Sequence, residues 1–383
     1  MKTKIGIIST DRADVGILRP IITALNSEGS FDTVVIATGS HMENDSLSAE
    51  FDIFSKVVVI GASMGGLDTY IASSALGKIT TDCAVAYREE NFDVILFAGD
   101  RMDLLAAVMP ALPLNIPLIH VHGGEVSIGA IDDRVRHALT KFSHLHCVSN
   151  KFAAARVSRM GEEAWRICIC GAPSIDTLLC EKTLDRDQFL SMLNLPEAFK
   201  SPMCLMTVHP STNSTGEQGI IENAISAATQ KNYKILLTGT FSDPGAKALM
   251  QSINKFGANE NIAFIPHLGS LLYKNALIHS DFVIGNSSSG IVEAGFFKRP
   301  SINVGTRQLG RDKGPGVINC DIETEDIINA ISKSENIKIE KSYLYGDGQS
   351  SARIVNVIRK FLPHKDFLRK KFADEKQTFT DPW

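Results

Sequence analysis

The chain has 383 residues, a net charge of −4 and a pI near 6.2, and its 44% hydrophobic content is enough for two sizeable cores. This balance gives no reason to expect nucleic acid or an anionic membrane as a partner, so any anion must be bound by a local site. No long apolar run or signal-peptide pattern points to membrane insertion or export, and seven cysteines without a CxxC pair are typical of reduced thiols in a cytoplasmic protein.

Short apolar runs alternate with longer segments of helical spacing along the first part of the chain. Several runs are apolar at consecutive residues, as in parallel strands that are covered on both faces. The segment ILRPIITALNSEG (17–29) has its apolar residues at helical spacing. The predicted strands are KIGIIST, TVVIATG, KVVVIG, DVILFAG, PLIHVHG, HLHCVS and RICICG.

The same alternation recurs after a break at residues 171–173 and a polar stretch at 181–200, with a predicted helix in EQGIIENAISAATQKN (217–232). The predicted strands of this second part are PMCLMTVHP, YKILLTG, IAFIPH, DFVIGN and RPSINVG. Repeated βα units predict an α/β protein with two Rossmann-like domains facing a cleft. We expect domains at 1–172 and 173–364, followed by a charged, partly mobile tail at 365–383.

Polar residues follow six of the predicted strands. Ligands of doubly wound sheets bind beyond the carboxyl ends of the strands, so these six positions are the candidate ligand site. They are DRAD at 11–14, GDR at 99–101, HGGE at 122–125, HP at 209–210, GNSSSG at 285–290 and GTRQ at 305–308.

The segment GNSSSGIVEA predicts a turn of serines between a strand ending at Asn286 and a helix starting at Ile291. Amides and hydroxyls at a helix N-terminus make a phosphate site, although a plain serine cap is the alternative. Glu293 in the first helical turn would repel a phosphate and suits sugar hydroxyls better. Arg307, one strand later, can offset the phosphate charge.

In the tripeptide GDR, Asp100 and Arg101 leave the strand in opposite directions, so that one can face a sugar and the other a phosphate. An internal ion pair between the two is the alternative reading. His120 and His122 alternate with Val121 and are expected on one face of the next strand. No third ligand completes a zinc site there, and we expect the glycines that follow to admit a substrate.

Asp132 and Asp133 can cap a helix whose polar face carries Asp132 and Arg136 at i, i+4 spacing. An ordinary salt bridge is the alternative reading of that pair. If Asp100 and Glu125 converge with Asp132, their mutual repulsion raises the pKa of at least one carboxyl group, which separates an acid from a base.

These motifs together resemble the UDP-N-acetylglucosamine 2-epimerase family, and within it the hydrolysing branch that supplies sialic and related nonulosonic acids. The resemblance runs from the N-terminus to about residue 354, and this chain has GGEVS where the non-hydrolysing branch has an EAGLRT-like sequence. The matching motifs are DRADVGILRP, AGDRMDLLA, HVHGGEVSIGAIDDRVRHALTKFSHLH, GAPSID, HPST, IGNSSSGIVEAG, PSINVGTRQLGR and YGDG.

The resemblance implies a glycosyltransferase-B type fold with UDP on the C-terminal domain. It implies elimination of UDP and hydration of a glycal to free N-acetylmannosamine, without metal or cofactor, in a cytoplasmic homodimer or higher oligomer. UDP-2,4-diacetamido-2,4,6-trideoxyglucose, on the legionaminic acid route, is the alternative substrate. A glycosyltransferase of the same fold and a UDP-sugar sensor are the rival functions.

His122 stands where some relatives have a catalytic glutamate, so either His122 or Glu125 is expected to accept the C2 proton. The expected catalytic residues are Asp100, His122, Glu125, Asp132, Arg136 and His209. The expected UDP-binding residues are Arg12, Arg101, His209, Asp243, His267, Ser287, Ser288, Ser289, Gly290, Glu293 and Arg307.

Overall fold

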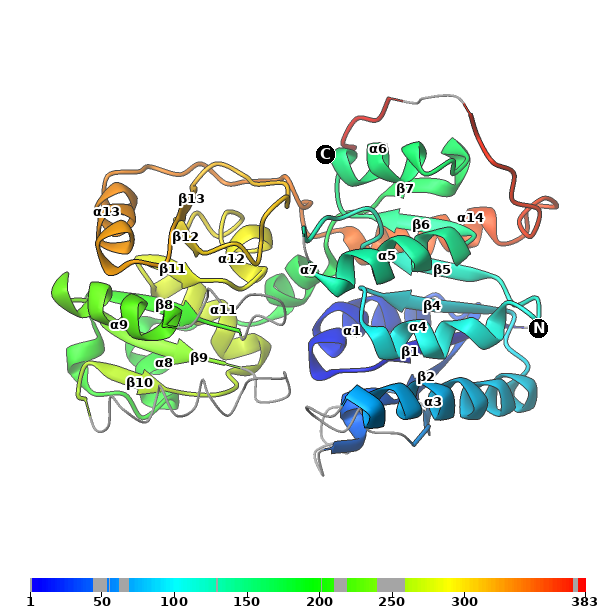
Figure 1. Cartoon of the computed structure of the whole chain (residues 1–383), viewed down its shortest axis with the longest axis horizontal. Coiled ribbons are helices and arrows are strands. Elements are labelled where there is room, and N and C mark those ends of the chain that lie inside the picture. The colour runs from blue at the N-terminus through cyan, green and yellow to red at the C-terminus, as the bar shows by residue number, and fades with distance from the viewer. Residues whose placement is uncertain are drawn as a thin grey trace. The chain divides into compact units, whose positions relative to one another are not determined.

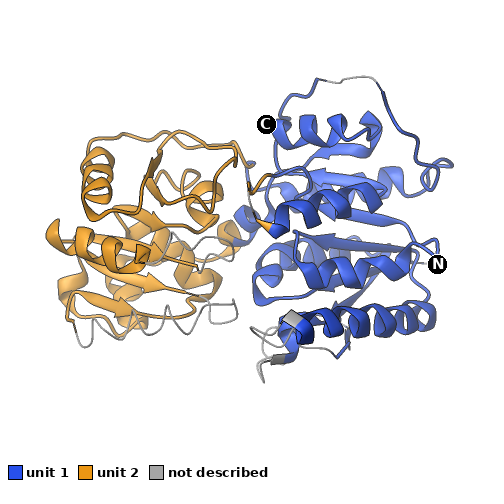
Figure 2. Cartoon of the chain, viewed as in Figure 1, with its two compact units in different colours: residues 1–125, 131–177, 346–383 blue, residues 126–130, 178–345 orange. Residues whose placement is uncertain are grey.

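The computed structural model divides the chain into two compact units (Figure 2). Unit 1 comprises Met1–Glu125, Ile131–Thr177 and Gly346–Trp383, and unit 2 comprises Val126–Ala130 and Leu178–Tyr345. The structure describes residues 2–43, 54, 56–61, 69–128, 130–200, 202–209, 219–239, 259–374 and 378–383.

Unit 1 is built on a seven-stranded sheet of order β3-β2-β1-β4-β5-β6-β7, in which every described pair of neighbours is parallel. The strands are β1 (Thr3–Ser9), β2 (Phe31–Ala37), β3 (Val57–Val59), β4 (Val94–Ala98), β5 (Leu118–Val121), β6 (Leu145–Val148) and β7 (Ile167–Ile169). The strand order reverses between β1 and β4. The carboxyl ends of these two inner strands therefore form the topological switch point of the sheet.

Helices cover both faces of this sheet (Figure 1). Leu18 of α1 (Arg12–Ser27) and Ile354 of α14 (Ser350–Phe361) belong to the core on one face. Ile79 of α3 (Thr69–Glu90), Leu104 of α4 (Met102–Val108) and Leu139 of α5 (Ile131–Phe142) belong to the core on the other. The unit also contains α6 (Lys151–Arg159), the start of α7 (Pro173–Cys180), and the 3₁₀ turns η1 (Gly39–Glu43), η2 (Met109–Ala111) and η3 (Ala164–Arg166).

Unit 2 has a six-stranded parallel sheet of order β10-β9-β8-β11-β12-β13, which reverses between β8 and β11. The strands are β8 (Met203–Thr207), β9 (Lys234–Thr238), β10 (Ile262–Phe264), β11 (Phe282–Gly285), β12 (Ser301–Val304) and β13 (Val317–Cys320). One core contains residues of α9 (Ile220–Gln230) and α13 (Thr324–Glu335), and the other those of α8 (Arg186–Met192) and α11 (Gly269–His279). The one-turn helix α12 (Ser289–Val292) and the turn η4 (Glu197–Lys200) complete the unit.

Every strand predicted from the sequence is present in its expected place, and the parallel α/β class is confirmed. The strand β13 was not predicted, because the segment VINC is short, polar at Asn319 and lies at a sheet edge. Among the described residues, no helix has the length and apolar character of a bilayer span.

The units do not meet at the domain boundaries that we expected, after residue 172 and after residue 364. The reason is that α14 packs in unit 1 and not in unit 2. The carboxylate of Asp176 accepts hydrogen bonds from the backbone N–H groups of Ser350 (3.1 Å) and Ser351 (2.7 Å), at the N-terminus of α14. These orphan helix donors are thereby satisfied by unit 1, while α14 packs on α1. Residues 173–177 and 346–364 consequently lie in unit 1.

The tail that we expected to be partly mobile is instead tied to unit 1 over its described first part. The fully buried Arg166 donates hydrogen bonds to the carbonyl oxygens of Asp366 (2.9 Å), Phe367 (2.7 Å) and Arg369 (3.0 Å). The Nζ atom of Lys370 lies 2.8 Å from the Glu162 carboxylate. A buried guanidinium needs such acceptors, and this requirement holds the tail in place.

Candidate functional site

The predicted residues of unit 1 gather at its switch point. Arg12 follows β1, while Asp100 and Arg101 follow β4, the strand that pairs with β1. The loop carrying His122 and Glu125 follows β5, the next strand along the sheet. The rule that ligands bind beyond the carboxyl ends of strands thus selects the same residues as the sequence motifs.

The buried Arg136, itself a predicted catalytic residue, connects two others. The side chain of Arg136 is only 2% exposed, and its Nη2 atom pairs with the Asp100 carboxylate. Its Nη1 atom donates a hydrogen bond to the Glu125 carbonyl oxygen at 2.9 Å and lies 3.3 Å from Asp133 Oδ1. A guanidinium at this depth requires a compensating carboxylate, so the pairing fixes Asp100 in place. Asp132 lies in the first turn of α5, which begins at Ile131, so it does not cap the helix as expected.

The two histidines of the HxH motif have different surroundings. His120 stacks on Phe97 with ring centroids 4.9 Å apart, and its Nε2 atom lies 2.9 Å from the Gly99 carbonyl oxygen. Its Nδ1 atom lies 3.2 Å from the Thr140 hydroxyl. Burial lowers the pKa of His120 to about 3, so the ring is neutral and donates its Nε2 proton to Gly99. His120 therefore braces the β4 and β5 loops.

His122 lies one residue beyond β5 and adopts a left-handed backbone conformation with φ of 67°, so strand alternation does not set its direction. Its Nδ1 atom lies 2.7 Å from Glu125 Oε1. The Nε2 atom is buried and has no hydrogen-bond partner among the residues that the structure describes. If Nδ1 carries the proton that Glu125 accepts, the Nε2 lone pair is available to a substrate proton, which is the arrangement of a carboxylate-oriented general base.

One glycine of this loop packs closely against a neighbouring helix, while the admission of a substrate by the loop stays a prediction. Gly124 has a positive φ of 77°, and a Cβ atom there would lie 2.5 Å from the Ala153 carbonyl oxygen on α6. Only glycine lets the loop approach α6 this closely. The loop conformation that presents His122 and Glu125 thus depends on Gly124.

Arg101 does not pair with its neighbour Asp100 but belongs to a separate polar cluster. Its Nη1 atom lies 3.7 Å from Asp11 and its Nε atom 3.4 Å from Asp103. Its Nη2 atom donates a hydrogen bond to Ser40 Oγ at 2.9 Å. The alternative of an internal Asp100–Arg101 pair is therefore not what the structure shows.

Sequence reasoning missed the buried carboxylates of this cluster. Asp14 accepts hydrogen bonds from the backbone N–H groups of Thr10 (2.7 Å) and Asp11 (3.1 Å), completing a capping box with Asp11. Burial, with repulsion from Asp11, raises the pKa of Asp14 to about 7. Burial also raises the pKa of Asp103. The acidic pair spaced three apart in DRAD was a local signal for the cap of α1.

In unit 2, one unpredicted residue joins two of the predicted ligands. The fully buried Asn286 accepts a hydrogen bond from the His209 N–H at 2.7 Å and donates one to the His209 carbonyl oxygen at 2.9 Å. Its own carbonyl oxygen accepts from Arg307 Nη1 at 3.1 Å and Gln308 Nε2 at 2.9 Å. Because β8 and β11 are neighbours at the switch point, His209, the serine loop and Arg307 come together there.

The serine loop differs from the expected helix N-terminus. The helix α12 has only four residues, Ser289–Val292, and its N-cap Ser288 makes no side-chain capping bond. Glu293 is buried at the C-cap of this turn and not in the first turn of a longer helix. One turn carries little dipole, so hydroxyls and loop amides are the phosphate-binding groups that this segment offers.

Within that loop, Ser287, Ser288 and Ser289 are all partly exposed, and Ser289 also hydrogen bonds to the Tyr273 hydroxyl. Gly290 is buried, and a Cβ atom there would lie 2.5 Å from Ser301 Oγ. The three serines are therefore more accessible than Gly290.

The contacts of the described residues do not link two further predicted residues to this group. His267 is exposed beyond β10, the edge strand two places from β8, so the structure does not bring it to the switch point. Asp243 lies outside the described residues. A shared site between the two units also stays a prediction.

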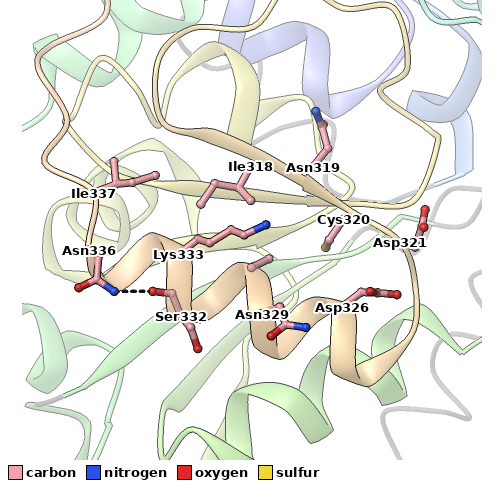
Figure 3. Close-up of a pocket in the computed structure, with 11 residues that line it drawn as sticks. Ile318, Asn319, Cys320, Asp321, Asp326, Asn329, Ser332, Lys333, Asn336 and Ile337 are labelled. Atoms are coloured by element: carbon pink, nitrogen blue, oxygen red, sulfur yellow. Dashed lines mark hydrogen bonds between the residues drawn. The ribbon is translucent and has the colours of Figure 1, made fainter.

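A surface hollow of about 850 Å³ lies between β13 and α13 (Figure 3). Asn319 and Cys320 line it from the strand, and Asn329 and Lys333 from the helix. It contains none of the predicted site residues and lies at the sheet edge away from the switch point.

The chain is similar to known proteins over almost its whole length. Residues 23–359 match the UDP-N-acetylglucosamine 2-epimerase family. The UDP-N,N'-diacetylbacillosamine 2-epimerase (hydrolyzing) of Legionella pneumophila is 32% identical over 376 residues, which cover 97% of this chain and 99% of the relative. The GDP/UDP-N,N'-diacetylbacillosamine 2-epimerase (hydrolyzing) of Campylobacter jejuni is 29% identical over 89% of this chain and 90% of the relative.

Solved structures with a similar fold include a UDP-GlcNAc 2-epimerase. The Methanocaldococcus jannaschii UDP-GlcNAc 2-epimerase, solved in complex with UDP-GlcNAc and UDP, has a TM-score of 0.75 and 20% identity, covering 94% of this chain and 100% of that chain. The predicted fold of glycosyltransferase-B type and the resemblance to the hydrolysing branch are confirmed. The chain belongs to the UDP-N-acetylglucosamine 2-epimerase family.

Proposed function

We propose that the protein is a hydrolysing UDP-sugar 2-epimerase whose substrate is UDP-N,N'-diacetylbacillosamine, the 2,4-diacetamido-2,4,6-trideoxy sugar nucleotide. The proposal for the sugar is supported by relatives at 32% and 29% identity whose names carry that substrate. UDP-GlcNAc is the second candidate, because the family is named for it. The products are UDP and the free sugar with inverted C2.

The observation that carries this proposal is the His122–Glu125 pair with its buried, unbonded Nε2 atom. In the first step the C1–O bond breaks and its electron pair leaves with UDP. The C2 proton passes to His122 Nε2, and the C2–H electron pair forms the C1=C2 bond of a glycal. Glu125 stabilises the resulting imidazolium and keeps the ring oriented.

Hydration of the glycal completes the reaction. A proton returns to C2 on the opposite face, and the hydroxide part of water bonds to C1, so one water is consumed for each UDP released. We propose that Asp100, which Arg136 holds in place, orients the water. We propose that Asp132 donates the proton that returns to C2. Carboxylates fixed around a reacting sugar perform such acid and base steps in other sugar hydrolases.

Cations and donors on the predicted nucleotide contacts stabilise the departing UDP. His209, Arg307, Ser287 and Ser288 provide such groups in unit 2, and Arg12 and Arg101 provide them in unit 1. Preorganised donors that face developing negative charge lower the barrier to its departure. We also propose that the protein is cytoplasmic and forms a homodimer or higher oligomer. Light scattering on purified protein measures the oligomeric state.

The test is incubation of the full chain with UDP-N,N'-diacetylbacillosamine and, separately, UDP-GlcNAc, with UDP release and product NMR followed together. We expect stoichiometric UDP and a free C2 epimer, with the diacetamido sugar turning over faster. A faster reaction with UDP-GlcNAc would reverse the substrate assignment. Transfer to an added acceptor with C2 unchanged would identify a glycosyltransferase, and tight binding without turnover would identify a sensor.

A further inference from the structure

The guanidinium of Arg101 contacts three different segments of unit 1, through one hydrogen bond to a serine and two carboxylates at ion-pair distance. Asp11 after β1 lies near Nη1, Ser40 after β2 accepts from Nη2, and Asp103 in the first turn of α4 lies near Nε. The side chain of Arg101 nevertheless remains 34% exposed. Part of the guanidinium group is therefore accessible to a ligand.

Asp103 is the most deeply buried of these partners, with a side chain that is 2% exposed. Its Oδ1 atom accepts a hydrogen bond from the backbone N–H of Leu104 at 2.9 Å. Its Oδ2 atom packs closely against Gly39. If residue 39 had a Cβ atom, that atom would lie only 2.3 Å from Oδ2. The Gly39 loop is fixed to the β1 end in turn, since the Ser40 N–H donates to the Thr10 carbonyl oxygen at 2.9 Å.

Such burial of a carboxylate is unfavourable unless a charged partner offsets it, and Arg101 is the charged group that the structure places beside Asp103. An arginine that is free to sample its rotamers loses side-chain entropy when it binds a ligand. An arginine that is already fixed avoids most of that cost and presents its donors in one geometry.

We propose that Asp103 is a positioning residue that fixes the Arg101 guanidinium for contact with the UDP moiety. This inference rests on the proposed function only in taking Arg101 as a nucleotide contact. Asp103 itself touches no substrate in this scheme. It acts by holding one orientation of Arg101 against Asp11 and Ser40.

Calorimetric titration of the full chain with UDP tests the inference without requiring turnover. Asp103→Asn removes the charge that faces Arg101 Nε, and we expect UDP to bind about tenfold more weakly. KM for the UDP-sugar should rise in parallel, while kcat changes less than twofold. The matched control Asp82→Asn removes an exposed carboxylate paired with Lys78 and should change none of these values.

A double-mutant cycle separates positioning from a general weakening of α4. In the Arg101→Ala background, Asp103→Asn should cause no further loss of UDP affinity, because the residue that it positions is absent. A full additional tenfold loss in that background would show that Asp103 acts independently of Arg101 and would overturn the inference.

A glycine pair supplies a second route that leaves Asp103 itself unchanged. Gly39 and Gly29 have similar positive φ values of 62° and 69°, so alanine strains the backbone comparably at both. A Cβ atom at Gly39 would collide with Asp103 Oδ2 at 2.3 Å and approach the Thr10 carbonyl oxygen at 2.9 Å, whereas at Gly29 it meets nothing within 4 Å. We expect Gly39→Ala, and not Gly29→Ala, to weaken UDP binding.

The outcomes distinguish this inference from the proposed function. Absence of sugar release by the wild type would refute the function, whereas UDP titration would still report on Asp103. Unchanged UDP affinity in both Asp103→Asn and Gly39→Ala, with thermal melts showing folded protein, would refute the positioning role. If Asp103→Asn fails to fold, Gly39→Ala and the Gly29→Ala control decide the question.

Discussion

At the residue scale, His122 is the position where this chain departs from the glutamate of some relatives. An imidazole oriented by Glu125 can accept a proton as that glutamate would. Within the described part of the chain its buried Nε2 atom has no hydrogen-bond partner, which suits the proton-accepting role that we propose for it.

His122→Gln should lower kcat at least about 100-fold, because an amide cannot serve as a general base. The measurement is UDP release together with deuterium uptake at C2 in heavy water, and both should fall in step. The exposed His364→Gln is the control and should leave both rates unchanged. Equal rates in wild type and His122→Gln would move the proton acceptor to Glu125.

Asn286 and Asn275 form a matched pair of fully buried amides in unit 2. Asn275 accepts from the Leu184 N–H at 2.8 Å, as Asn286 does from His209, but it contacts no predicted ligand residue. Replacing either asparagine with alanine should cost about 1–3 kcal/mol of stability. Only Asn286→Ala should also weaken UDP binding in calorimetry, and equal weakening by Asn275→Ala would deny Asn286 a specific role.

Glu162 should govern much of the acid sensitivity of unit 1. Burial alone would raise its pKa, but hydrogen bonds from His146, Lys141 and Lys370 outweigh burial and lower it to about 2. A depressed carboxyl pKa stabilises the fold above the ordinary value of 4.5, and this contribution is lost as the pH falls toward 2. It amounts to about 3 kcal/mol at neutral pH.

Chemical denaturation of wild type and Glu162→Gln between pH 2 and pH 7 measures this contribution. The stability difference between them should be largest above pH 4.5 and shrink toward pH 2. A difference that does not change with pH would contradict the assignment.

The approach of strand ends was easier to predict from the sequence than the contacts between side chains. Asp100 and Glu125 were expected to converge with Asp132, because strand ends follow from periodicity, whereas the structure joins Asp100 and Glu125 through Arg136. The partners of Arg101 and the function of Asn286 could not be predicted, because they depend on loops that approach only after the sheets have formed. The close approach of Gly124 to α6 could not be predicted for the same reason.

At the element scale, apolar runs were reliable because a parallel strand covered on both faces is apolar at nearly every position. Helix beginnings were less reliable. The helix α1 begins at Arg12, not near Ile17, because the Asp11–Asp14 capping box initiates it. The one-turn length of α12 could not be predicted, because the residues that follow it are as apolar as a helix face.

The C-terminal tail is an element whose removal has a graded effect. Ending the chain at Pro363 removes Lys370 from Glu162 and three carbonyl acceptors from the buried Arg166, so the melting temperature should fall by about 5 °C or more. Ending it at Asp374 keeps these contacts and should have a smaller effect. Equal melting temperatures for both truncations and the full chain would show that the tail contributes nothing.

At the whole-molecule scale, the sequence indicated two domains of the parallel α/β class, as the structure has them. It did not indicate which segments of the chain build each unit. Unit 1 is discontinuous, since α14 adds Ile354 and Ile358 to the core that contains Leu18 of α1. Chain order alone would assign α14 to the unit that precedes it, and no local pattern contradicts that assignment.

Fragments should reflect this chain path. A fragment of residues 1–177 lacks α14 and should fail to fold alone, because it leaves the apolar face of α1 uncovered. Adding residues 346–383 as a separate peptide should restore cooperative thermal unfolding measured by circular dichroism. Cooperative unfolding of 1–177 without the peptide would contradict this dependence.

The discontinuity of unit 1 also sets an order of events on the ribosome. The long inner segment Leu178–Tyr345 leaves the ribosome before α14 does, so its sheet can form first. The first domain to leave the exit tunnel is thus the last to finish, since its closing helix emerges only after the whole inner segment. Throughout that interval its nascent apolar surface is a natural substrate for chaperones.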